Sequence, residues 1–146
     1  MLATIEYIAT LSCTLFTGAA IYINLVEHPA RMGCETKTAF AQWAPSYKRA
    51  TVMQASLAII GFVAGVDAWL LGAGNMWLVG AVLLGVVVPF TFIAIMPTNH
   101  ILLAPGRDLS SPETHVLLEK WGRLHAVRSI LSLLASLVFV WLLTVT

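Results

Sequence analysis

The chain has 146 residues, of which 59% are hydrophobic and only 10% are charged. Its mean hydropathy is +0.87 and its formal net charge is +1. In soluble domains about 25% of the residues are charged, so this chain has too few charged side chains to cover a water-exposed surface. The composition excludes a disordered chain, a coiled coil and a water-soluble enzyme, and it predicts an integral, multi-pass membrane protein. The sequence lacks the basic stripe interleaved with aromatic residues that is typical of nucleic-acid-binding proteins. Its two cysteines, Cys13 and Cys34, do not form a CxxC pair.

Four apolar segments are long enough to cross a bilayer, which requires about 20 residues each. They cover residues 7–26, 50–71, 76–96 and 124–143. The turn at residues 72–75 is so short that the second and third segments should form an antiparallel hairpin. We therefore predict an all-α fold, a single four-span transmembrane domain over residues 1–146 arranged as a four-helix bundle.

The basic residues lie on one side of this predicted bundle. All eight Lys and Arg, and all four His, lie in or next to the connections 27–49 and 97–124. The turn between the second and third spans and both termini carry none. By the positive-inside rule, both connections are predicted to be cytoplasmic, with the N- and C-termini on the outer side.

Capping residues and prolines predict where the helices begin and end. Ser111 is a good N-cap and Pro112 suits a first helical turn, so we expect one helix from Pro112 to about residue 143. At 1.5 Å per residue this helix is about 48 Å long and projects into the cytoplasm. Pro45 is predicted to start the helix of the second span, while Pro29 and Pro97 are predicted to end the first and third.

Polar side chains recur at helical spacing along three of the spans and end on the cytoplasmic side. Polar groups at membrane depth usually face the interior of a bundle, so these stripes predict a shared pocket with a polar mouth. The residues concerned are Cys13, Thr17, Asn24, Glu27, His28 and Arg31 in the first span; Asn99 and His100 at the end of the third; and Tyr47, Thr51, Gln54, Trp121, His125, Arg128, Ser132 and Ser136 in the second and fourth.

Several of these residues also have a purely structural explanation. His28 could bond lipid headgroups at the membrane interface, and Trp43, Tyr47 and Trp121 could be interfacial aromatic anchors. What favours a functional site is that three His, one Glu, one Asn and two Arg gather at helix ends on the same side.

A pair of small residues in the second span, Gly61-x-x-x-Gly65, indicates close helix packing. The same face would allow a homodimer. A non-catalytic protein that binds or exports a small hydrophobic molecule is therefore the alternative to an enzyme.

Three short motifs carry most of the polar residues on the cytoplasmic side. They are Glu27-His28-Pro29-Ala30-Arg31, Met96-Pro97-Thr98-Asn99-His100-x-Leu102 and Trp121-x-x-Leu124-His125-x-x-Arg128. With them, nearly the whole chain resembles the anthrone oxygenase-like membrane family, a set of small four-span proteins. Its characterised fungal members oxidise polyketide anthrones to anthraquinones with dioxygen. The resemblance implies an oxidoreductase that acts with dioxygen on a hydrophobic phenolic, polycyclic or quinol-like substrate taken from the lipid.

Such an oxidation begins with the removal of a proton, so it requires a base near neutral pH, and His28 or His125 would serve, with Glu27 orienting an imidazole. It also requires hydrogen-bond donors aimed at the developing phenolate oxygen, a role for Arg128 or Asn99. Arg31 is a third candidate donor. The side chains predicted to contact the substrate are Arg31, Trp43, Tyr47, Thr51, Gln54 and Trp121.

The reaction of a carbanion with dioxygen requires no cofactor, but a metal-dependent variant is the alternative. His28, His100 and His125 would form a nitrogen-rich ligand set suited to iron, copper or zinc, and one or two of them could hold a haem. No HxxxH or ExxH pair is present, so the spacing alone does not identify a metal site.

Overall fold

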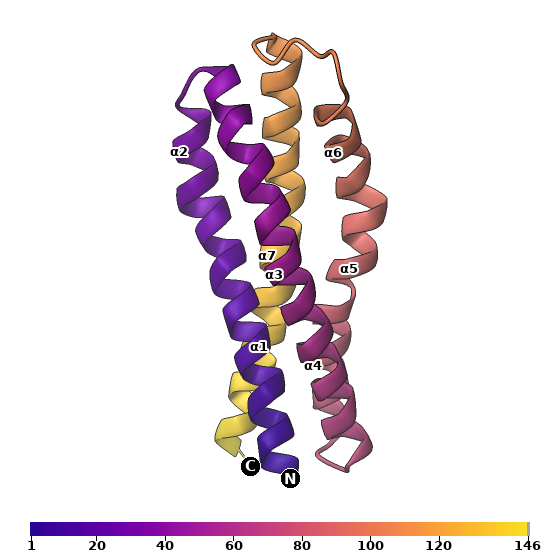
Figure 1. The fold of residues 1–146 in the computed structure, drawn as a ribbon. Helices are drawn as coiled ribbons and strands as arrows, with labels where there is room; N and C mark the ends of the chain where they lie inside the picture. Colours follow the sequence, from indigo (N-terminus) through magenta and orange to yellow (C-terminus); the bar gives the residue numbers. More distant parts are fainter. Residues whose placement is uncertain (146) are drawn as a thin grey trace.

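Four long helical rods pack side by side and alternate in direction in the computed structural model, which describes residues 1–145 (Figure 1). Two short π-helical segments, η1 and η2, interrupt the first and third rods. Along the chain the elements are α1 (Leu2–Tyr22), η1 (Ile23–Glu27), α2 (His28–Met32), α3 (Thr36–Leu70), α4 (Asn75–Gly85), α5 (Val87–Phe90), η2 (Thr91–Ile95), α6 (Met96–Leu102) and α7 (Pro112–Val145).

The four rods confirm the predicted all-α architecture. Each of the four, Leu2–Met32, Thr36–Leu70, Asn75–Leu102 and Pro112–Val145, is long and apolar enough to cross a membrane. Both termini lie at the same end of the bundle as the turn between α3 and α4, and the other two connections lie at the opposite end (Figure 1). We call these the terminal end and the loop end. Which end faces the cytoplasm stays a prediction.

Most of the two segments that connect the apolar spans at the loop end is helical. Helix covers most of the segment 27–49, leaving only residues 33–35 between α2 and α3. Of the segment 97–124, only residues 103–111 lie outside helices. The rods therefore carry their polar side chains beyond the apolar spans, where helix geometry fixes them relative to one another.

Prolines do not end the rods, so the predicted boundaries at Pro29 and Pro97 are wrong. A proline in a helix has no N–H to donate and crowds the carbonyl four residues earlier, which here lies inside η1 or η2. In both segments the chain widens: the N–H of His28 donates to the carbonyl of Ile23, and that of Met96 to Thr91. In each segment an N–H donates to the carbonyl five residues earlier instead of four. This shift of the hydrogen-bond pattern lies just before each proline, and the helix continues past it.

The prediction that Pro45 starts the second helix is also wrong. α3 begins at Thr36, with Glu35 as its N-cap, and Pro45 lies inside it. By contrast, the start of α7 is confirmed, because the backbone N–H of Thr114 donates to Ser111 Oγ at 3.2 Å, as an N-cap requires. α7 then runs without a break to Val145.

At the terminal end the rods pack closely through small residues. A Cβ atom on Gly61 would lie 2.7 Å from Leu84, and one on Gly65 would lie 2.9 Å from Phe139. Both glycines are buried inside the bundle, so their close contacts lie within one chain, and a homodimer stays a prediction. They instead allow α3 to approach α4 and α7, as small residues do in membrane helices.

Candidate functional site

Polar side chains of three rods converge near the loop end around a small space, which we call the polar chamber. Its volume is about 10 Å³, close to the room that one water molecule needs. It is lined by Ile23, Arg31, Ser46, Tyr47, Ala50, Thr51, Gln54, Trp121, His125 and Arg128. The predicted convergence is therefore confirmed for seven of the sixteen residues of the polar stripes, namely Arg31, Tyr47, Thr51, Gln54, Trp121, His125 and Arg128.

An aromatic wall of α3 and α7 residues lies beside the chamber. Trp43 stacks on Tyr47 with ring centres 5.2 Å apart, and the edge of Trp121 meets Trp43 at 5.9 Å. On its other side Trp121 stacks on the His125 ring at 5.0 Å. Both tryptophans are buried, so within this bundle they are core residues rather than interfacial anchors.

His125 lies at the centre of the polar contacts. Its Nδ1 is 2.7 Å from Asn24 Oδ1, which also accepts a hydrogen bond from Ser129 Oγ at 2.6 Å. The other side of the Asn24 amide, Nδ2, donates to the backbone carbonyl of Gly122 at 3.0 Å. His125 itself is 1% exposed, so the imidazole is held in place away from solvent.

His28 occupies a different place. Its ring lies against Trp121, with centres 5.3 Å apart, and against the backbone of α7 at Gly122. A Cβ on Gly122 would come 2.4 Å from His28 Nε2, so only glycine permits this packing. His28 is not among the residues that line the chamber; Trp121 lies next to both imidazoles.

Glu27 does not orient an imidazole, contrary to the sequence prediction. Its Oε1 accepts hydrogen bonds from Arg31, from Gln42 at 2.8 Å and from Ser46. The carboxylate thus joins the first rod to α3 and pairs with Arg31. In residues 1–145 the side chain that contacts the His125 ring nitrogen is that of Asn24 instead.

The chamber is rich in hydrogen-bond donors. Arg128 Nη2 donates to Gln54 Oε1 at 2.9 Å, and its guanidinium lies 5.5 Å from the centre of the Phe16 ring. Within the described chain, buried donor atoms without a hydrogen-bond partner remain on four chamber residues: Arg128 Nε, Gln54 Nε2, Trp121 Nε1, and Arg31 Nε and Nη1. The lining includes no carboxylate. Unpaired buried donors are costly, and an oxygen atom carrying negative charge would satisfy them.

A second space, the middle cavity, adjoins the chamber. It has a volume of about 150 Å³ and shares four lining residues with the chamber, namely Tyr47, Thr51, Gln54 and Arg128. Its remaining lining is mainly apolar: Phe16, Ala55, Ala58, Val87, Val88, Thr91, Phe92 and Met96. The predicted combination of an apolar pocket with polar groups at one end is confirmed here.

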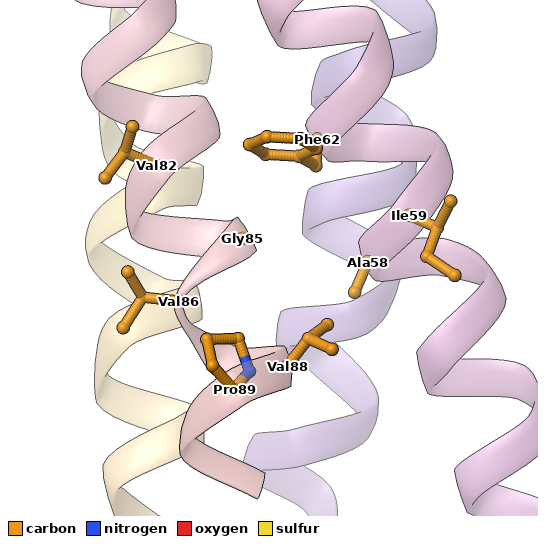
Figure 2. A pocket seen from close by; sticks show the side chains of 8 residues that line it. All are labelled: Ala58, Ile59, Phe62, Val82, Gly85, Val86, Val88 and Pro89. Atoms are coloured by element: carbon orange, nitrogen blue, oxygen red, sulfur yellow. The ribbon is translucent and has the colours of Figure 1, made fainter. Parts of the chain in front are cut away.

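A third space, the lateral groove, opens between α3 and the α4–α5 junction (Figure 2). Its volume is about 380 Å³ and its lining is apolar. At one side the ring of Phe62 lies against Gly85, where a Cβ would come within 2.6 Å of it. Ala58 and Val88 line both this groove and the middle cavity, so the three spaces form a series from the outer surface of the bundle to His125.

Like Glu27, His28 and Trp43, the two predicted site residues of α6 do not line the chamber. Asn99 is buried on α6, where its Nδ2 is 3.7 Å from Met96 Sδ, and it is not part of the chamber lining. His100 is exposed. Across residues 1–145 no group of three or more His, Cys, Asp and Glu is placed to hold a metal ion, so His28, His100 and His125 do not form the predicted ligand set.

The sequence indicated Asn24 as a polar residue facing inward but gave no sign of its contact with His125. That contact depends on η1, whose wider turn sets how the first rod faces α7. The sequence also gave no sign of the lateral groove, because groove residues such as Ile59 and Val86 are ordinary apolar residues of a membrane helix.

Comparison with known proteins identifies the family of the chain. Residues 43–138 match the sequence profile of the anthrone oxygenase family. The chain is 26% identical over 138 residues to anthrone oxygenase tpcL of Aspergillus fumigatus, with 88% of this chain and 86% of that protein covered. It is likewise 26% identical over 148 residues to an anthrone oxygenase of Claviceps purpurea, with 91% and 84% covered. No solved structure gives a significant match.

Proposed function

The chain belongs to the anthrone oxygenase family, and from this premise we propose that it oxidises a flat, hydrophobic phenolic or polycyclic substrate of the anthrone type with dioxygen. The substrate and dioxygen both dissolve in lipid. The lateral groove offers an apolar route from the bilayer to the middle cavity, so neither molecule has to pass through water.

The proposed position of the substrate is the middle cavity, with one polar edge directed at the chamber. Ligand sites usually combine apolar walls with a few polar groups that fix the orientation. Here the apolar walls come from α1, α3, α5 and η2, and the polar groups are Tyr47, Gln54 and Arg128. Met96, which accepts a hydrogen bond from Tyr47 Oη at 3.5 Å, forms part of the far wall.

In this proposal His125 is the base. It lines the chamber, whereas His28 does not, and the ring nitrogen that Asn24 binds is Nδ1. A histidine ring exchanges protons near neutral pH more readily than any other side chain. We assign to it the removal of one proton from the methylene group between the substrate rings.

The donors of the chamber would stabilise the negative charge that develops on the substrate oxygen. Arg128 and Gln54 border both the chamber and the middle cavity, so their free N–H groups can reach such an oxygen without displacing a protein partner. Donors that are already fixed before the reaction stabilise a developing charge effectively, because they need no reorganisation.

The balanced reaction consumes one dioxygen and releases one water. The carbanion gives its electron pair to dioxygen, forming a C–O bond and a peroxide that takes up the proton held by His125. Loss of the second methylene proton then breaks the O–O bond. The carbon becomes a carbonyl, one oxygen atom stays on the product, and the other leaves as water. A metal or haem, the alternative raised by the sequence, stays a prediction.

One observation carries the proposal: unpaired donors and a partnered histidine meet in a chamber that adjoins an apolar cavity. The test is to incubate detergent-purified protein with anthrones and hydroquinones under air and to follow quinone absorbance and oxygen consumption. His125→Ala should lower turnover by about 10²- to 10⁴-fold, the usual contribution of an acid–base group.

His115→Ala is the matched control, because His115 is a half-exposed histidine on the same helix and should leave turnover unchanged. Equal rates for wild type and His125→Ala would contradict the proposal. Saturable substrate binding without any oxygen consumption would instead favour the binding or export alternative. Full turnover after treatment with a chelator would exclude the metal-dependent variant.

A further inference from the structure

The hydrogen bonds around Asn24 determine which nitrogen of His125 carries its proton. An amide has one end that only accepts and one that only donates. The Asn24 end facing the Gly122 carbonyl must be the donating NH₂, because a carbonyl oxygen only accepts. The oxygen end therefore faces His125 Nδ1 at 2.7 Å.

The carbonyl of Gly122 decides the orientation of the amide. A flipped amide would set two oxygens against each other at Gly122. The Ser129 hydroxyl can donate or accept, and with the amide so fixed it donates to Asn24 Oδ1 at 2.6 Å. In this orientation Nδ1 of His125 is a donor.

We propose that Asn24 is a positioning residue that holds neutral His125 as the Nδ1–H tautomer and leaves the lone pair of Nε2 as the proton acceptor on the chamber side. This inference deepens the proposed function and rests on it for the role of His125 in turnover. The tautomer itself follows from the contacts of Asn24 alone. Since a histidine ring has one acceptor nitrogen when neutral, the residue that binds the other nitrogen decides whether the ring can act as a base at the substrate.

The backbone of the first rod places Asn24 for this role. Asn24 lies in η1, one residue after the π-helical segment begins at Ile23. Glu27, at the other end of η1, is bound by Gln42 and Ser46 of α3. The segment is thus held to α7 through Asn24 and to α3 through Glu27, which fixes the Asn24 amide between the backbone of α7 and the imidazole.

The test measures the tautomer directly, in protein labelled with ¹⁵N-histidine and reconstituted in lipid bilayers. In wild type we expect His125 to show a protonated Nδ1 and an unprotonated Nε2. Asn24→Leu, which keeps the size but removes the acceptor, should produce the Nε2–H tautomer or a mixture. It should lower kcat by about 10- to 100-fold, the usual loss when the partner orienting a functional histidine is removed, with little change in KM.

Two variants separate this role from a structural one. Asn24→Asp keeps an acceptor oxygen, so it should keep the Nδ1–H tautomer and retain more turnover than Asn24→Leu. Thr17→Val removes another buried contact between α1 and α7, the 2.8 Å hydrogen bond of Thr17 to Ser136, and should change neither the tautomer nor kcat.

The inference is overturned if wild-type His125 carries its proton on Nε2, or if Asn24→Leu leaves the tautomer unchanged. A changed tautomer with an unchanged kcat would also overturn it. Because the tautomer is read without substrate, failure of the proposed function appears separately, as absence of turnover in wild-type protein that still shows Nδ1–H.

Discussion

Among residues 1–145, buried polar atoms without a hydrogen-bond partner are more frequent in the loop half of the bundle than in the terminal half, where Trp77 Nε1 is one. In the terminal half, polar groups bond one another between α1 and α7: Thr17 bonds Ser136, and Cys13 Sγ lies 3.4 Å from the same hydroxyl. In the loop half, chamber residues such as Arg128 and Gln54 keep donors without partners.

The difference indicates a division of roles along the same four rods. Small residues and a stacked Trp77–Phe139 pair, with ring centres 5.2 Å apart, pack the terminal half tightly. Such packing is what holds membrane helices together, because lipid and apolar side chains offer no hydrophobic driving force between helices. Toward the loop end this packing gives way to the middle cavity and the polar chamber. Stability and chemistry should therefore respond to different substitutions.

After His125, the largest effect on turnover is expected at Arg128, one of the two arginines that line the chamber. Arg128→Met keeps much of the side-chain volume but removes the charge and the donors. It should lower kcat by about 10²- to 10³-fold, as loss of a preorganised donor does. Arg123→Met is the control, since Arg123 is exposed on the same helix. Steady-state oxygen consumption measures the kcat of both variants. Equal losses of kcat in Arg128→Met and Arg123→Met would contradict a specific role for Arg128.

A change in the terminal half should affect stability and leave chemistry intact. A Cβ on Gly80 would lie 2.5 Å from the buried ring of Phe139, whereas a Cβ on Gly18 meets nothing within 4 Å. Both alanine variants gain the same helix propensity, so their difference isolates the clash. Gly80→Ala should be less stable than Gly18→Ala by about 1–3 kcal/mol, the usual cost of overpacking.

Thermal unfolding in detergent, followed by circular dichroism, measures this difference. The turnover of the folded fraction should be the same for both variants. If Gly80→Ala lowered kcat without lowering the midpoint of unfolding, the proposed division between a stabilising terminal half and a catalytic loop half would be wrong.

The smallest effect is expected at the junction of the lateral groove and the middle cavity. Val88 lines both spaces, so Val88→Phe should narrow the route and raise KM several-fold with little change in kcat. Val79→Phe, at an exposed position of α4 that lines neither space, is the control. An unchanged KM in Val88→Phe would show that the substrate reaches the site by another route.

Much of the fold could be predicted because it depends on local patterns. The lengths of the apolar segments, the N-cap at Ser111 and the short turn between α3 and α4 each follow from neighbouring residues. The prolines were misjudged because the rule that they end helices ignores π-helical segments. Whether a helix can widen before a proline depends on the helices packed around it, which no local pattern records.

The sequence predicted which residues are candidates for the site, but not which of them contact one another. Polar residues at helical spacing identified His125, Arg128, Gln54 and Tyr47, all of which line the chamber. His100 and Asn99 belong to the same end of the bundle but lie outside the chamber, since side-chain direction depends on the rotation of each rod.

The sequence by itself determined that four apolar helices carry their basic and imidazole groups at one end, because hydropathy and charge are properties of the residues themselves. Only the tertiary structure decided that Asn24, and not Glu27, meets the His125 ring, and that apolar spaces lie between the chamber and the outer surface of the bundle. Both depend on how the rods are rotated and spaced, and η1, η2 and the buried glycines set that rotation and spacing through contacts between residues far apart in the chain.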